Sequence, residues 1–254
     1  QYFAYPRVEV MDGTEPSIEA LLEGVDAKSE DYTQKLQNAK DPVGMSVQSD
    51  RTVISSMNEV GPFANYLLAW WKLNGNTKDF AGGYYDATNN GAAIRDGVGQ
   101  TAYFFDGSDY IRAPQDPYAP ALDENSSSLT LSGWIRPTAL NTNSTNHSIQ
   151  NCWLAHSSGS FNDNMELGVD ASTNDIQVYF DTSGSDSTNA STGVTAPLDT
   201  WTHVIVTLNR NGTPTMKLYK NGNLQLTDTS TWSATNGTLD QAGAEVTIGA
   251  SRSY

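Results

Sequence analysis

The chain has 254 residues, 37% of them hydrophobic, and a formal net charge of −15 that comes from 29 acidic and 14 basic residues. No basic cluster is present to neutralise phosphates, so the sequence argues against binding to nucleic acid or to an anionic membrane surface. No run of about 18 apolar residues occurs, which argues against insertion into a membrane.

Residues 1–65 are expected to form an N-terminal arm with two short amphipathic helices and an extended segment. The first helix follows Pro16, and its apolar residues share one helical face: Ile18, Leu21, Leu22 and Val25. The second helix is expected at about 29–40 and the extended segment at 45–60. These elements bury too little surface to form a core, so we expect the arm to pack on the following domain or on a neighbouring subunit.

Residues 66–254 show the alternation of polar and apolar residues that is typical of short β-strands. Within 128–136 the alternating residues are Leu129, Leu131, Gly133 and Ile135, and within 201–209 they are Thr202, Val204, Val206 and Leu208. Asn221-Gly222 separates two alternating runs and predicts a hairpin with a type I′ turn, because both residues accept positive φ. About ten or eleven such strands predict an all-β fold, a two-sheet antiparallel jelly-roll sandwich.

Six short segments, spread over roughly residues 66–254, form a recognisable series: Leu73-Asn-Gly-Asn-Thr-Lys-Asp-Phe-Ala-Gly-Gly, Phe105-Asp-Gly-Ser-Asp-Tyr-Ile, Leu129-Thr-Leu-Ser-Gly-Trp-Ile-Arg-Pro, Trp201-Thr-His-Val, Leu218-Tyr-Lys-Asn-Gly and Val246-Thr-Ile-Gly-Ala. Together they resemble the laminin G-like, concanavalin A-like jelly-roll domains. Each segment alone is weak evidence, but their order and spacing are fairly specific to the fold. The resemblance implies a sandwich of two antiparallel sheets, usually an extracellular binding or adhesion module, although fold does not fix function.

One departure from the family concerns the last strand. Such domains usually continue past the Ile-Gly-Ala strand into one more strand, whereas this sequence ends at Tyr254. Either the chain is a truncated piece, or another segment completes the sheet, for which 45–60 is the candidate. An empty strand position would expose unpaired backbone groups and apolar surface.

Two loops carry oxygen ligands of the kind that calcium prefers. Asn76 and Asp79 lie in the first loop, together with Asn74 and Asp86, and Asp106 and Asp109 lie in the second. The resemblance implies a Ca²⁺ in the first loop, with Asp79 as its main ligand. The alternative is that Asn, Asp and Gly serve here only as turn residues.

Glycan binding would need an aromatic platform flanked by amide and carboxylate groups. We expect Tyr84, Tyr85 and Trp232 to supply it, with Trp232 either exposed or packed beneath a long loop. The tryptophans that lie in strand patterns are expected in the core instead: Trp70, Trp134 and Trp201.

Catalysis is not expected. Glycoside hydrolases on this sandwich carry paired carboxylates in a Glu-X-Asp-X-X-Glu pattern on one strand, and that pattern is absent from the sequence. Glu166 and Asp170 would share a face of a strand, and His203 is expected to be structural.

Two functions therefore compete. The first is a non-catalytic extracellular or surface-exposed module that recognises glycan or a cell surface through sandwich loops, with assistance from Ca²⁺. The second is a structural subunit of a virion, fibre or filament, in which residues 1–65 dock on neighbouring copies and the jelly-roll projects outward.

Overall fold

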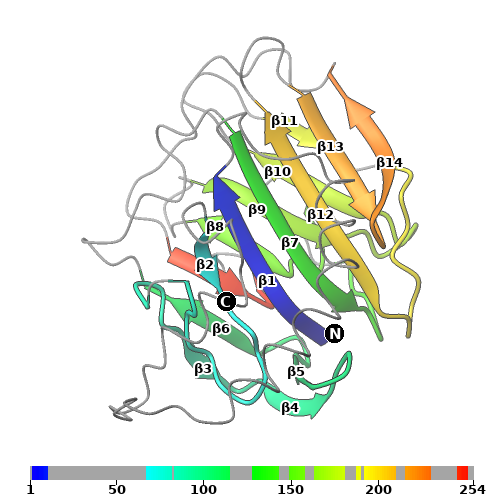
Figure 1. The fold of residues 1–254 in the computed structure, drawn as a ribbon. Coiled ribbons are helices and arrows are strands. Elements are labelled where there is room, and N and C mark those ends of the chain that lie inside the picture. The colour runs from blue at the N-terminus through cyan, green and yellow to red at the C-terminus, as the bar shows by residue number, and fades with distance from the viewer. Residues whose placement is uncertain are drawn as a thin grey trace, which may run out of the picture.

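The computed structural model of the chain describes residues 2–10, 67–81, 83–114, 128–142, 149–157, 163–180, 187–189, 192–209, 215–229 and 245–250. These residues form fifteen β-strands, arranged as two antiparallel sheets that face each other (Figure 1). No helix occurs within the described ranges, and so none there could cross a membrane. The predicted all-β sandwich is confirmed.

The first sheet has eight strands. Its order is β14 (Asn223–Asp228), β13 (Thr215–Lys220), β12 (Thr202–Asn209), β7 (Ser128–Arg136), β1 (Tyr2–Val10), β5 (Thr101–Phe104) and β4 (Ala93–Asp96), and β2 (Leu67–Trp70) also pairs with β1.

The second sheet has seven strands. Its order is β11 (Ser187–Asn189), β10 (Ile176–Phe180), β9 (Asp163–Val169), β8 (Leu154–Ser157), β15 (Glu245–Ile248), β6 (Tyr110–Ala113) and β3 (Thr88–Asn90). β5 and β6 flank the Asp106-Gly107 turn but belong to different sheets, so this turn carries the chain from one sheet to the other.

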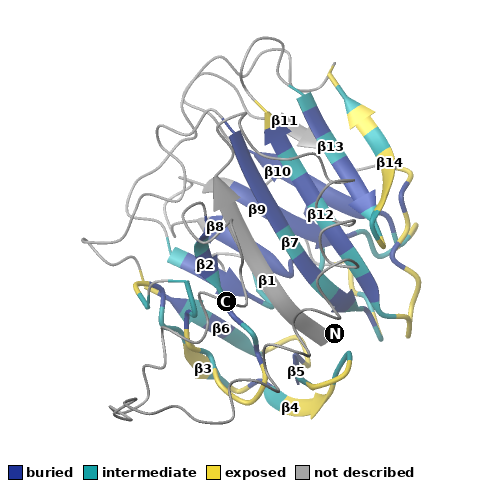
Figure 2. Cartoon of the chain, viewed as in Figure 1, coloured by how far each residue is buried: buried dark blue, intermediate teal, exposed yellow. Residues whose placement is uncertain are grey.

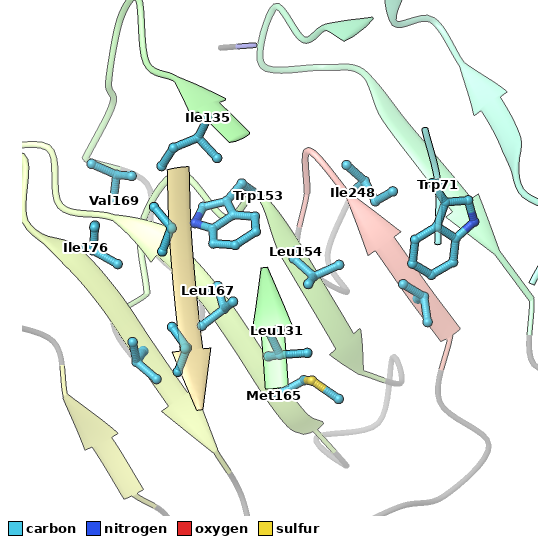
Figure 3. Close-up of a cluster of buried hydrophobic side chains, with 14 of the residues drawn as sticks. Trp71, Leu131, Ile135, Trp153, Leu154, Met165, Leu167, Val169, Ile176 and Ile248 are labelled. Atoms are coloured by element: carbon cyan, nitrogen blue, oxygen red, sulfur yellow. The ribbon is translucent and has the colours of Figure 1, made fainter. Parts of the chain in front are cut away.

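The core lies between the sheets and receives every second residue of the long strands. Along β12 buried and half-buried residues alternate from Thr202 to Leu208, as the sequence predicts. Figure 3 shows the core, where side chains of β7, β9 and β15 meet two tryptophans, Trp71 and Trp153, that are almost completely buried.

The predicted hairpin is also confirmed. Asn221 and Gly222 have φ values of 50° and 79°, and Lys220 pairs with Asn223 across the turn. The asparagine also ties the turn to the neighbouring strand, because its Oδ1 accepts a hydrogen bond from the backbone N–H of His203 at 2.9 Å.

The N-terminus differs from the expected organisation, because β1 is an inner strand of the eight-stranded sheet and not part of an arm outside it. It pairs with β7 on one side and with β5 and β2 on the other. The register with β7 shifts between Ala4 and Arg7, and Pro6 falls within that irregular step. A proline has no N–H to donate, so it is tolerated in an inner strand only at such an irregularity.

Residues 2–10 therefore belong to the sandwich, which the sequence analysis placed within 66–254. The remaining elements of the expected arm, namely the two helices and the extended segment 45–60, lie outside the described residues.

Candidate functional site

The Asp79 loop joins β2 to β3, and the Asp79 carboxylate organises it. Asp79 is buried, and its Oδ1 accepts hydrogen bonds from the backbone N–H groups of Trp70 and Ala81, both at 2.9 Å. Its Oδ2 accepts from the N–H groups of Gly83 and Tyr85, at 3.1 and 3.3 Å. Four backbone donors thus converge on one side chain, and their hydrogen bonds to the carboxylate hold the loop in place.

The neighbouring polar residues of this loop also bind one another. Asp86 accepts from the backbone N–H of Asp79 at 3.0 Å and from Lys78 Nζ at 2.8 Å. Asn76 Oδ1 accepts from the backbone N–H of Lys78 at 3.0 Å, and its amide lies 3.5 Å from Asn74 Oδ1. Asn74 and Asn76 are exposed.

The second acidic loop is a turn between the sheets. Asp106 Oδ1 accepts from the backbone N–H and the hydroxyl of Ser108, at 2.9 and 2.8 Å, and Asp109 Oδ2 accepts from the backbone N–H of Asp106 at 3.1 Å. The Ser108 hydrogen bonds hold the pKa of the exposed Asp106 carboxyl below its usual range. Among the described residues, no three Asp, Glu, His or Cys side chains gather closely enough to hold a metal ion.

The three expected glycan-binding aromatics have different surroundings. Tyr84 is exposed, at 43% of its surface. Tyr85 is buried and contacts Trp71 edge-on, with the ring centroids 6.4 Å apart, while its carbonyl accepts from Trp71 Nε1 at 2.8 Å. The expectation for Tyr85 is corrected accordingly, because a core side chain presents no face to a ligand. Trp232 lies outside the described residues.

The expected core tryptophans are half-buried instead. Figure 2 shows intermediate residues alternating with buried ones along β12. The second half of β7 alternates in the same way, and Trp134 is intermediate there, as is Trp70 in β2. Trp201 is also half-buried. Because the core face of β7 is formed by Leu129, Leu131 and Ile135, the intervening Trp134 lies on the outer face of the sheet.

Trp134 forms an aromatic pair on that outer face. It lies directly opposite His203 of β12, and the two rings stack with centroids 5.0 Å apart and an interplanar angle of 23°. Both side chains are half-buried. The half-buried rings leave part of their apolar surface accessible, which is suited to contact with the apolar face of a ligand. We call Trp134 and His203 the outer-face platform.

Charged side chains lie next to the outer-face platform. Arg136 is two residues from Trp134 on the same strand and shares its face. Its Nε donates to the Asp199 carbonyl oxygen at 3.1 Å, and its Nη2 lies 3.6 Å from Asp199 Oδ1. The sequence analysis did not single out Arg136 or Asp199 as site residues. For Arg136 a signal was present, because the alternation that places Ile135 in the core places Trp134 and Arg136 on the outer face.

Glu166 and Asp170 do not form a carboxylate pair on one strand. Glu166 is fully buried on β9, opposite Tyr179 of β10 and Ala155 of β8, whereas Asp170 follows the strand and shapes the turn to β10. Asp170 Oδ1 accepts from the N–H and hydroxyl groups of Ser172 and Thr173 at 2.6 to 3.1 Å.

These turn hydrogen bonds predict an effect of pH. The Ser172 hydroxyl, followed by the Thr173 N–H, holds the pKa of Asp170 below its ordinary value near 4. The ionised carboxylate therefore contributes stability at pH values above its pKa in the unfolded chain, and this contribution is lost as the pH falls through the lower folded pKa. Below about pH 4, we expect the melting temperature of Asp170→Asn to fall less steeply with decreasing pH than that of the unsubstituted chain. Identical acid profiles of the two proteins, measured by circular dichroism, would contradict this.

Comparison with known proteins identifies the fold. The model of the laminin G family described as the concanavalin A-like lectin/glucanases superfamily matches residues 105–254. No curated protein sequence matches the chain.

Solved structures match with low sequence identity. Domain 4 of an extracellular arabinanase from Geobacillus stearothermophilus, solved with arabinotriose, has 19% identity and a TM-score of 0.47, with 70% of this chain and 80% of that domain covered. The binding domain of botulinum neurotoxin serotype G has 17% identity and a TM-score of 0.45, with 67% of this chain and 40% of that chain covered. The binding domain of Paraclostridial Mosquitocidal Protein 1 has 16% identity and a TM-score of 0.47, with 68% and 44% covered.

Proposed function

Because the chain belongs to the concanavalin A-like lectin/glucanases superfamily, we propose that it is a non-catalytic extracellular module that binds glycan on the outer face of its eight-stranded sheet. The observation that carries the proposal is the outer-face platform of Trp134 and His203. A sugar ring presents C–H groups on one face and hydroxyl groups around its edge, so it needs an apolar surface bordered by polar groups. Trp134 supplies the surface, and Arg136 and Asp199 border it.

The proposal predicts that Trp134→Ala weakens glycan binding. A sugar ring that covers one face of the indole removes apolar area from water. Loss of the indole should therefore cost about 2 kcal/mol of binding free energy, or roughly 30-fold in affinity. A glycan array of the purified chain would select the ligand, and calorimetry of the variant would then measure the affinity. An unchanged affinity in a variant with the unsubstituted melting temperature would overturn the platform as the binding site.

Tyr84→Ala is the matched comparison, because Tyr84 is an exposed aromatic residue in the loop that the sequence favoured. We expect this variant to keep its affinity. If Tyr84→Ala lost binding while Trp134→Ala retained it, the site would lie in the loops and not on the sheet.

Calcium binding at Asn76, Asp79, Asp106 and Asp109 stays a prediction, and the same experiment tests it when run with Ca²⁺ and again with EDTA. The absence of catalysis also stays a prediction. Release of new reducing ends from a bound glycan would contradict it, and Glu166 would then be the first carboxylate to substitute.

The second candidate, a subunit of a surface assembly, rests on residues 1–65 as a docking arm. The pairing of β1 inside the sheet weakens that argument, because residues 2–10 already serve the sandwich. Oligomers formed through the remaining residues of this segment stay a prediction.

A further inference from the structure

We propose that the Asp199 carboxylate and the Arg136 guanidinium recognise two neighbouring hydroxyl groups of an uncharged glycan beside the outer-face platform. This inference rests on the glycan-binding function proposed above and adds the class of glycan and the residues that select it.

The first argument is the way Asp199 is held. It has a φ of 54°, in the left-handed region that few residues other than glycine adopt, although Asp is among those that tolerate it. Its backbone N–H donates to the Pro137 carbonyl at 2.7 Å, and its own carbonyl accepts from Arg136 Nε. Both backbone groups are therefore fixed, while the side chain stays 69% exposed. The fixed backbone therefore keeps the exposed carboxylate close to the Arg136 guanidinium.

The second argument is the chemistry of the pair. A carboxylate only accepts hydrogen bonds and a guanidinium only donates them. Two adjacent hydroxyl groups can satisfy both, because one donates to Asp199 while the oxygen of the other accepts from Arg136. The separation of 3.6 Å between Nη2 and Oδ1 is longer than an ordinary hydrogen bond but within the range of an ion pair, so the acceptor and the donor lie side by side.

The third argument is position. Arg136 lies two residues from Trp134 on one face of β7, which places their Cα atoms about 7 Å apart. One sugar residue could therefore stack on the outer-face platform while its edge hydroxyl groups reach the charged pair.

The fourth argument concerns ligand charge. The carboxylate and guanidinium compensate each other, so the pair offers no net charge to an ion. The chain as a whole carries −15, and its field repels anions at low salt. Both effects favour uncharged sugars over sugars that carry carboxylate or sulfate groups.

The experiment compares matched oligosaccharides on the complete chain by calorimetry. One set is uncharged, a second carries a uronic acid in place of the same sugar, and a third has one of the adjacent hydroxyl groups converted to a methyl ether. We expect the uncharged set to bind at least tenfold more tightly than either of the others. The methyl ether tests recognition of the hydroxyl pair without any change in the protein.

Substitutions at Asp199 and Arg136 test whether these two residues produce the preference for the uncharged set. Asp199→Asn and Arg136→Gln should each lower the affinity for the uncharged set about tenfold and reduce the discrimination against the methyl ether. Asp96→Asn, an exposed carboxylate on the edge strand β4, is the matched control and should change neither. The melting temperature of each variant reports whether it is folded.

The outcomes distinguish the inference from the function on which it rests. One contrary result is that the acidic set binds more tightly than the uncharged set, in a way that added salt weakens and Trp134→Ala abolishes. That result would support the glycan-binding function and overturn the inference about uncharged glycans. Equal binding of the methyl ether would overturn it as well. No binding of any glycan would overturn both.

Discussion

Replacing Asp79 with alanine should lower the free energy of unfolding by about 3–5 kcal/mol. The carboxylate accepts four backbone N–H groups, and each donor left without a partner in a part-buried loop costs free energy. Asp79→Asn should also destabilise, because whichever way the amide turns, its NH₂ group faces two backbone donors. Denaturant unfolding of the two variants measures both effects.

Asp106→Ala is the control for this prediction. Asp106 also accepts hydrogen bonds within a turn, but it is exposed, so water can replace the carboxylate and little stability should be lost. The measurement also separates two roles of Asp79. If Asp79→Ala lost stability only when Ca²⁺ is present, the carboxylate would act as a metal ligand and not as a partner of the backbone.

Gly249→Ala should be about as damaging, at roughly 3–5 kcal/mol. Gly249 follows β15 with a φ of +87°, and a Cβ atom there would lie 2.2 Å from Cδ1 and 2.4 Å from Cε1 of Phe105. The Phe105 ring is buried in the core and cannot move aside without displacing its neighbours. The cost therefore combines backbone strain with overpacking.

Gly75→Ala isolates the backbone part of that cost. Gly75 has a φ of +99°, but a Cβ atom there would meet nothing within 4 Å. We expect it to cost only about 1–2 kcal/mol, the strain of a positive φ. Equal losses in the two variants would mean that the Phe105 contact contributes nothing. The double variant Gly249→Ala/Phe105→Leu should lose less than the sum of its two single variants.

Most of the sandwich could be predicted from sequence because its strands alternate. In β12 and β7 one face is apolar and the other is not, which fixes both the strand and its orientation. In the run from Leu67 to Leu73 nearly every residue is apolar, so a period of two cannot show whether Trp70 or Trp71 points inward. The packing decides: Trp71 is in the core and Trp70 lies outside, where Lys72 Nζ sits 4.7 Å from its ring centroid.

The candidate site could be predicted less well, because its residues have more than one common use. An aspartate in a loop rich in Asn and Gly is equally typical of a calcium ligand and of a turn, and the sequence does not show that four backbone N–H groups converge on Asp79. The outer-face platform needs the pairing of Trp134 with His203, two residues far apart in sequence. A single sequence holds no information on that register.

The position of β1 bears on how the chain folds. Ala4 pairs with Trp134, so β1 cannot pair with β7 until more than a hundred further residues have been synthesised. Contacts so distant in sequence are formed late and slow the search for the native state. Deleting the first ten residues would also leave two inner strands with open edges, the kind of surface on which chains join into aggregates. Fusions intended to preserve the fold should therefore leave the N-terminal strand intact.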